Sequence, residues 1–322
     1  MLRLALIALL AVFATSVKAE TWPSRPLTMV VPFATGGPMD AVARILQFAL
    51  SGALQQQVIV ENVGGAGGMI GAARVAKSAP DGYQFVLGNV GTQAVSQTLY
   101  KTPLYNSMTD FTPVALIADL TLVMVARKDL PANNLQEFIA YAKANRKTMQ
   151  FASAGAGSAT HLGCALINAR IGVDVTHVPY RGGALAMQDL VAQRVDYLCI
   201  DTPAAIPQIE SGAIKPIAIL SRGRSPSLPN LASAHEQGLT DFEATNWSAF
   251  FLPKDTPASI VQKLHDATVA AMNNPTVQQR FKENRIDLVA EERRSPAYLA
   301  QFVASEIAKW AGPINSLGLA LE

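Results

Sequence analysis

Two glycine-containing loops, one in each half of the chain, carry groups that could bind an anion. The first loop contains Gly36 and Gly37, and the second carries the hydroxyl groups of Ser158 and Thr160 directly after Gly157. Each loop precedes a stretch of helical spacing, so its backbone N–H groups would lie at the positive end of a helix dipole. If the two halves of the chain face each other, these groups would form one anion site that needs no lysine or arginine.

Other polar residues near the loops allow both a structural and a ligand-binding interpretation. Asp40 could stabilise the first turn of its helix through the helix dipole, or it could contact a ligand or water. His161 could cap its helix or line the cleft, and we favour the cleft. Asp201 follows a strand and could line the cleft or cap the helix that begins at Pro203. We expect His177 to pack or hydrogen-bond beneath a third glycine loop.

The sequence lacks the motifs of common enzymes and cofactor sites. The nucleophile elbow GxSxG does not occur, because Ser158 stands in GxGSxT. The glycine run 64–68 is expected to be a packing loop, since Ile70 stands where a GxGxxG motif needs its third glycine. The four histidines are neither at HExxH spacing nor near clustered cysteines. We therefore expect no metal, no cofactor and no catalytic residue, and an exported α/β hydrolase assembled only by the fold stays a remote alternative.

The residues around the first loop predict a strand, a tight turn and a helix. Residues 27–31 form an aliphatic, β-branched run that suits a strand covered on both faces. Pro38 suits the first turn of a helix, where no intrahelical N–H is needed. Apolar residues then recur at helical spacing, namely Val42, Ile45, Leu46, Ala49 and Leu50.

The rest of the chain alternates strands and helices, which is typical of an α/β fold. Strands are also predicted at 58–60, 84–87, 149–152, 175–178, 195–200 and 216–220, and long helices at 259–272 and 296–317. Apolar stretches that pass Asp119 and Asn246 predict two crossings between domains. We therefore predict a first domain of residues 20–120 and 245–322 and a second domain of residues 121–244.

Length and composition agree with a two-domain globular protein. The chain has 322 residues, half of them hydrophobic and only 16% charged, and domains usually have about 150 residues. Loss of Arg3 and Lys18 with a leader leaves 24 basic and 24 acidic residues. A nucleic-acid partner is not expected, because it would require a basic surface.

The first nineteen residues resemble an export leader. Arg3 precedes an apolar run at 4–13, and Val17-Lys18-Ala19 has the small-x-small pattern of a cleavage site. The run is shorter than the roughly 20 residues that span a bilayer. We expect a soluble exported protein that begins near Glu20. Cys164 and Cys199 fall in a predicted helix and a predicted strand, and we expect two buried free thiols.

Long segments of the mature chain carry a family resemblance: WPSRPLTMVVPFATGGPMDAVAR, VIVENVGGAGGMIGAARVAKSAPDGYQFVLG, HVPYRGGALAMQDLVAQRVDY, NWSAFFLPKDTP and the later EIAKW. In this order they resemble the substrate-binding proteins of tripartite tricarboxylate transporters, the Bug family. The resemblance implies a type II periplasmic binding protein fold, in which two α/β domains close around a small carboxylate. It also implies a monomer in the periplasm that delivers its ligand to membrane permease subunits. Presentation of the ligand to a sensor of a two-component system is the alternative.

The resemblance also implies which residues hold the ligand. The family uses the loop that corresponds to residues 33–37, with Asp40 nearby, and the loop that corresponds to residues 153–161. The usual first loop reads PFPPGG, whereas this chain has Ala34 and Thr35 in place of two prolines. With Met39 and Asp201 from the residue analysis, the candidate ligand-binding residues are Phe33, Ala34, Thr35, Gly36, Gly37, Met39, Asp40, Ser153, Gly157, Ser158, Thr160, His161 and Asp201.

Apolar residues of the first loop predict a preference among acids. Pro38, Met39 and Ala34 would present apolar surface to the part of the ligand remote from its carboxylate. Aromatic or aliphatic acids should therefore bind more tightly than short, highly charged acids such as citrate.

Overall fold

Strand β1 (Leu27–Val31) lies inside the first of two sheets, as its continuous apolar sequence predicts. The structure is a computed structural model that describes residues 22–316 and 318. The neighbours of β1 are β2 (Val58–Asn62) and β3 (Gln84–Asn89), and both run parallel to it. The sheet continues with β9 (Thr245–Pro253), which is antiparallel to β3, and with β4 (Phe111–Arg127), which is antiparallel to β9.

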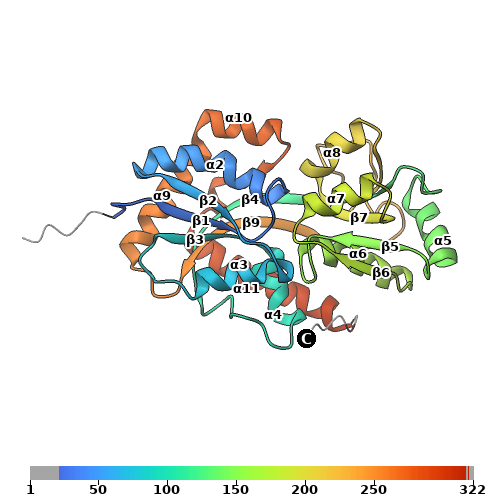
Figure 1. Cartoon of the computed structure of the whole chain (residues 1–322), viewed down its shortest axis with the longest axis horizontal. Coiled ribbons are helices and arrows are strands. Elements are labelled where there is room, and N and C mark those ends of the chain that lie inside the picture. The colour runs from blue at the N-terminus through green and yellow to red at the C-terminus, as the bar shows by residue number, and fades with distance from the viewer. Residues whose placement is uncertain (1–21, 317, 319–322) are drawn as a thin grey trace, which may run out of the picture.

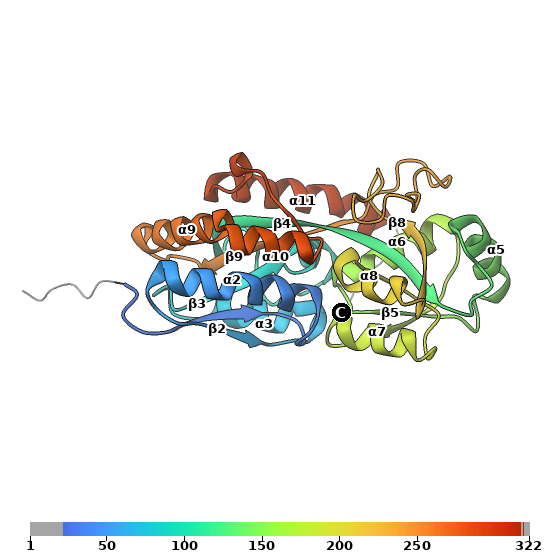
Figure 2. The ribbon, with the colours of Figure 1, turned by 90° about the horizontal axis from the view of Figure 1, so that it is seen from above.

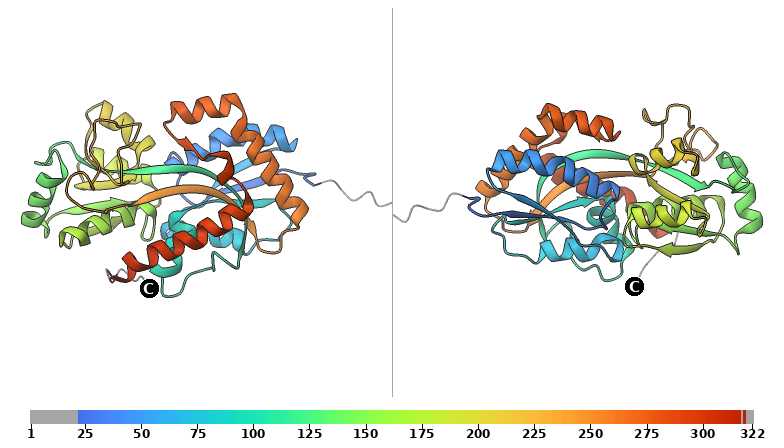
Figure 3. Two further views of the ribbon diagram at one scale, coloured as in Figure 1. Left: turned by 180° about the vertical axis from the view of Figure 1, so that it is seen from behind. Right: turned by 45° about the horizontal axis from the view of Figure 1, so that its top comes forward.

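Strand β4 is long enough to take part in both sheets. Its first half pairs with β9 and with the short β10 (Asp287–Leu288), and its second half pairs with β7 (Tyr197–Asp201) and β8 (Ile214–Ile219). Two parallel strands complete the second sheet, β5 (Gln150–Ser153) and β6 (Thr176–Pro179). The two apolar stretches that flank Asp119 are therefore one continuous strand, and β4 and β9 pass side by side between the two lobes (Figure 3).

Helices cover the faces of both sheets and leave two α/β lobes along the long axis of the molecule (Figures 1 and 2). Around the first sheet lie α2 (Pro38–Leu54), α3 (Met69–Ala76), α4 (Ser96–Leu99), α9 (Ala258–Asn273), α10 (Pro275–Glu283) and α11 (Pro296–Ser316). Around the second sheet lie α5 (Leu135–Asn145), α6 (Ala159–Ile171), α7 (Gly183–Val191) and α8 (Thr202–Glu210). Three short helical turns connect these elements, η1 (Ala66–Gly68), η2 (Gly91–Val95) and η3 (Glu291–Arg293).

The helix that closes the chain, α11, is fastened to the strand that returns from the second lobe. Trp247 on β9 is fully buried, and its indole N–H donates to the buried Glu306 carboxylate of α11 over 3.0 Å. The Trp247 ring also contacts Phe302 edge to face. The predicted ranges 259–272 and 296–317 agree with α9 and α11 to within a residue at each end.

The two cysteines form a disulfide, so the expectation of two free thiols is wrong. Cys164 of α6 and Cys199 of β7 are bonded, with their Cα atoms 5.5 Å apart. The helix can approach the strand this closely because Gly163 stands at the contact: a Cβ there would lie 3.2 Å from Cys199 Cβ. The packing of α6 on β7 sets the distance between the two sulfur atoms, and the spacing of residues along the chain does not encode that distance.

The predicted leader, residues 1–19, lies outside the described residues. Within the part of the chain that the structure describes, no helix combines the length and the apolar character needed to cross a membrane.

Candidate functional site

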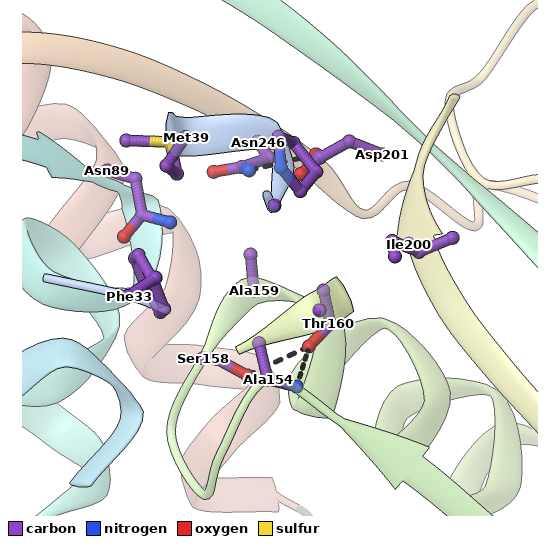
Figure 4. A pocket seen from close by; sticks show the side chains of 13 residues that line it. Phe33, Met39, Asn89, Ala154, Ser158, Ala159, Thr160, Ile200, Asp201 and Asn246 are labelled. Carbon is purple, nitrogen blue, oxygen red and sulfur yellow. Dashed lines mark hydrogen bonds between the residues drawn. The ribbon is translucent and has the colours of Figure 1, made fainter. Parts of the chain in front are cut away.

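A cavity lies between the two lobes, where the N-termini of helices from both lobes meet (Figure 4). Its walls come from the first loop and α2, from the end of β3, from the second loop and α6, from the start of α7 and the end of β7, and from β9. Strand β9 is one of the two hinge strands, β4 and β9, that cross between the lobes. The lining residues are Phe33, Gly37, Pro38, Met39, Asn89, Ala154, Ser158, Ala159, Thr160, Gly183, Ile200, Asp201 and Asn246. No lysine, arginine or histidine is among these lining residues.

The first loop is held in shape by Asp40, which points away from the cavity. The buried Asp40 carboxylate accepts hydrogen bonds from the Gly36 N–H, from Arg44 Nε and from Asn62 Nδ2, each within 3.0 Å. Burial by itself would raise the pKa of Asp40, but the hydrogen bonds from Arg44, Gly36 and Asn62 lower it below its usual value. Asn62 Nδ2 also donates to the Phe33 carbonyl over 3.0 Å. Asp40 does not line the cavity, and it shapes the first loop through these hydrogen bonds. The Gly36 N–H, which we expected to face an anion, is bonded to Asp40 instead.

The second loop is held by its own hydroxyl groups. Ser158 is the N-cap of α6: its Oγ accepts from the His161 N–H over 3.2 Å and donates to the Gly155 carbonyl over 2.6 Å. Thr160 Oγ1 lies 2.9 Å from Ser158 Oγ and accepts from the Ala154 N–H over 2.7 Å. The N–H groups of Ala159 and Thr160, in the first turn of α6, donate to no group among the described residues and stay available at the cavity wall.

Two histidines form the floor beneath the second loop and do not line the cavity. The His161 and His177 rings stack with centroids 4.2 Å apart, and both also stack on Phe151. His161 Nδ1 accepts from the Gly157 N–H over 3.2 Å, and His177 Nε2 lies 2.7 Å from Ser153 Oγ. Burial lowers the pKa of His161 to about 3, with a further contribution from His177, and burial lowers the pKa of His177 to about 4. Both rings are therefore neutral near pH 7.

The structure divides the sequence-predicted residues into two groups. The residues that line the cavity are Phe33, Gly37, Met39, Ser158, Thr160 and Asp201. Those that do not line it are Ala34, Thr35, Gly36, Asp40, Ser153, Gly157 and His161. Most of the second group build the two loops through the hydrogen bonds described above, whereas Thr35 is exposed on the surface.

Two polar residues at the cavity were missed by the sequence analysis. Asn89 ends the parallel strand β3, and polar residues at the carboxyl ends of parallel strands are a general signal for ligand sites that could have identified it. Its Oδ1 accepts from the Thr92 N–H over 3.1 Å, which leaves the amide nitrogen directed into the cavity (Figure 4). Asn246 lies on the hinge strand β9, and no motif around it in the sequence indicates a ligand site.

Asp201 ends β7 at the hinge side of the cavity. It precedes α8, and its side chain makes no capping hydrogen bond to that helix. Its Oδ1 accepts from Asn246 Nδ2 over 2.9 Å, so the contact joins the end of β7 to the hinge strand β9. Burial raises the pKa of Asp201 to about 6, and the hydrogen bond from Asn246 opposes this rise in part. The sequence allowed Asp201 to line the cleft or to cap α8, and the structure places it in the cavity wall.

Loops of the two lobes touch across the mouth of the cavity. The Ala34 N–H donates to the Arg181 carbonyl over 3.1 Å, and the Tyr100 hydroxyl donates to the Ala156 carbonyl over 2.8 Å. Gly67, in the glycine run 64–68, has φ +62°, and a Cβ there would overlap the Ala156 carbonyl oxygen. The glycine run therefore packs against the second loop, and the cleft is closed.

Residues 42–319 match the family described as tripartite tricarboxylate transporter family receptor. The chain belongs to this family. This match confirms the resemblance seen in the sequence.

Solved structures agree with this assignment. The periplasmic binding protein BugD is 37% identical, with a TM-score of 0.90 over 94% of this chain and all of that chain. MatC of Rhodopseudomonas palustris, solved with bound malate, is 37% identical, with a TM-score of 0.89 over 91% of this chain and all of that one. Rpa4515 of R. palustris, solved with adipate, is 33% identical, with a TM-score of 0.87 over 93% of this chain and 99% of that one. The prediction of a type II periplasmic binding protein fold is confirmed.

Proposed function

We propose that this transporter receptor binds a small carboxylate in the cavity between its lobes and delivers it to membrane permease subunits. The observation that carries the proposal is the cavity wall itself. It combines the N-terminal turns of α2 and α6 with no lysine, arginine or histidine, so an anion would be held by backbone N–H groups and neutral side chains. The bound malate and adipate of the two related structures support a carboxylate as the ligand class.

In this proposal, six of the predicted residues contact the ligand and most of the others shape the loops. Phe33, Gly37, Met39, Ser158, Thr160 and Asp201 form the wall that faces the ligand, together with Asn89 and Asn246. Hydrogen bonds from N–H groups to a charged acceptor contribute roughly 1.5 to 3 kcal/mol each. Three or four of them contribute about 4.5 to 12 kcal/mol before the losses on association, and micromolar binding corresponds to about 8 kcal/mol.

The proposal also covers the export of the protein, its location and the motion of its domains. The leader would be cleaved near Ala19 and the mature protein would act in the periplasm as a monomer. The first domain would comprise residues 20–120 and 245–322 and the second residues 121–244, with hinge motion in β4 and β9. Binding and release, without a chemical reaction, would be its whole activity.

A thermal-shift screen tests the proposal. The mature chain is heated with each member of a panel of mono-, di- and tricarboxylates, aromatic acids and amino acids. A true ligand raises the stability by RT ln(1 + [L]/Kd), about 2.7 kcal/mol at a hundred times Kd. A panel in which no carboxylate raises the melting temperature would contradict the proposal.

A further inference from the structure

Asp201 is the one ionisable side chain in the wall of the cavity. It is 3% exposed, and no cationic side chain lines the space that it faces. An anionic ligand would therefore bring a second negative charge into a closed cavity next to this carboxyl group. Two like charges at one buried site cannot both be ionised at low cost, so one of the groups must bind a proton or receive a hydrogen-bond donor.

The orientation of Asp201 is fixed by the hinge strand. The Trp247 N–H donates to Asn246 Oδ1 over 2.9 Å, so the amide nitrogen of Asn246 must face Asp201. That nitrogen donates to Asp201 Oδ1 over 2.9 Å. The backbone N–H of Asp201 itself also interacts with this carboxyl group. Oδ2 accepts from no side chain of the described residues, so this oxygen is left for the ligand.

The remaining polar groups of the cavity wall are mostly donors. Asn89 directs its amide nitrogen inward because its Oδ1 accepts from Thr92. The first turns of α2 and α6 present N–H groups. An ammonium group has three N–H donors and would find one free acceptor, Asp201 Oδ2. The wall therefore suits a ligand whose second polar group accepts hydrogen bonds.

We propose that Asp201 holds this second group as a neutral carboxylic acid, with its proton on Oδ2 donated to a ligand carboxylate oxygen. Capture of a fully ionised dicarboxylate would then take up one proton from the solvent, and release of the ligand would return it. The inference rests on the proposed function, because it needs an acid ligand in this cavity. Burial already raises the pKa of Asp201 to about 6, and the ligand's negative charge raises this pKa further.

Ionisable groups on the elements packed around Asp201 have partners elsewhere, and β9 carries none. On α2, Asp40 pairs with Arg44. On β4, Asp119 pairs with Arg293, and Arg127 pairs with both Asp129 and Asp196. Asp189 of α7 pairs with Arg194, and Glu210 of α8 pairs with Arg285. On α6, His161 is stacked on His177 and Arg170 donates to the Thr240 carbonyl. Burial lowers the pKa values of the two histidines to about 3 and about 4, so neither titrates between pH 6 and pH 8.

The direction of the pH effect follows from linkage. The ligand-bound state holds one proton more than the free state above about pH 6, so affinity falls as the pH rises from 6 to 8. A change of one proton weakens Kd by up to tenfold per pH unit. An asparagine in place of Asp201 carries an uncharged amide N–H, which can donate the same hydrogen bond to the ligand at every pH.

Calorimetric titration tests the proposal, with malate, succinate, glutarate, adipate and aspartate as probes. For each acid that raises the melting temperature, the heat of binding is measured at pH 7.5 in two buffers of different ionisation enthalpy, and Kd is measured at pH 6, 7 and 8. We expect the wild-type protein to take up close to one proton per dicarboxylate. Asp201→Asn should take up no proton, and its Kd should not change between pH 6 and pH 8. Asp241→Asn, which changes an exposed acid paired with Arg222, is the matched control and should behave like the wild type.

Two kinds of failure are distinguishable. If no carboxylate raises the melting temperature, the proposed function is wrong and the inference fails with it. If a dicarboxylate binds without proton uptake, or if Asp201→Asn still takes up a proton, the role of Asp201 is wrong and the function stands. Tighter binding of aspartate than of every dicarboxylate, without proton uptake, would also overturn the inference, because Asp201 would then be an ionised partner of an ammonium group. The wild-type measurement decides the matter even if the variant fails to fold.

Discussion

Gly36 donates its backbone N–H to the Asp40 carboxylate over 2.9 Å, and this bond closes the first loop back onto the first turn of α2. The same carboxylate holds Asn62, which in turn binds the Phe33 carbonyl. Asp40 thus shapes the site without lining the cavity. The N–H groups left for a ligand belong to the residues that follow Gly36.

Asp40→Ala should therefore weaken ligand binding indirectly and destabilise the fold. The change removes three hydrogen bonds to a buried charge and leaves their donors unpaired, so we expect a loss of roughly 1 to 3 kcal/mol of unfolding free energy. Denaturant unfolding and calorimetry measure the two effects. Asp129→Ala, which breaks an ion pair between the exposed Asp129 and Arg127, is the control and should change the stability by less than about 1 kcal/mol. An Asp40→Ala protein with unchanged stability would contradict the structural role.

Ser158→Ala and Thr160→Val should each weaken carboxylate binding by roughly 1 to 2 kcal/mol without unfolding the protein. The two hydroxyls contact each other and hold the loop from which the N–H groups of α6 are presented. Arg181→Ala is the control, because its exposed side chain is not part of the cavity wall. If binding were lost only in the Arg181 variant, a side-chain cation would carry the recognition of charge.

Ligand binding should shift the protein from an open to a closed form. The closed cleft is held by few direct bonds between the loops, among them Tyr100 to the Ala156 carbonyl, so opening costs little without a ligand. Small-angle scattering should show a smaller radius of gyration with a saturating ligand. Tyr100→Phe should weaken binding by about 1 kcal/mol, because it removes one hydrogen bond that only the closed form makes. An unchanged radius of gyration would indicate a rigid cleft.

Loss of the disulfide should lower the stability of the second lobe. Cys164 and Cys199 are 35 residues apart, and closing a loop of this length in the unfolded chain is worth about 2 to 4 kcal/mol. The double variant Cys164→Ala with Cys199→Ala, measured by thermal unfolding against the wild type with and without a reductant, tests this. A wild-type protein that titrates with two thiols under native, non-reducing conditions would rule out the bond.

The histidine stack predicts how the stability depends on pH. Burial lowers the pKa of His161 to about 3 and that of His177 to about 4, whereas both would be near 6.5 in the unfolded chain. The unfolded state therefore binds more protons below pH 6.5, so stability is fully present above pH 6.5 and is lost progressively as the pH falls toward 3. The loss is at most about 1.4 kcal/mol per pH unit for each ring. His161→Gln should flatten this slope.

The sequence alone determined the α/β fold, the two glycine-opened helices and the receptor family, because these depend on local patterns and on long motifs. Residues 27–54 show this most clearly: a β-branched run, a glycine turn and Pro38 specify a strand and a helix start without help from distant residues. Only the tertiary structure decided which polar atoms face the ligand. Asp40 and His161 turned inward to hold loops, Asn89 and Asn246 turned toward the cavity, and Cys164 met Cys199 across a glycine contact. The physical reason is that a side chain's partners come from elements far away in sequence, and hydrogen bonding among buried groups, which no local spacing encodes, sets its direction.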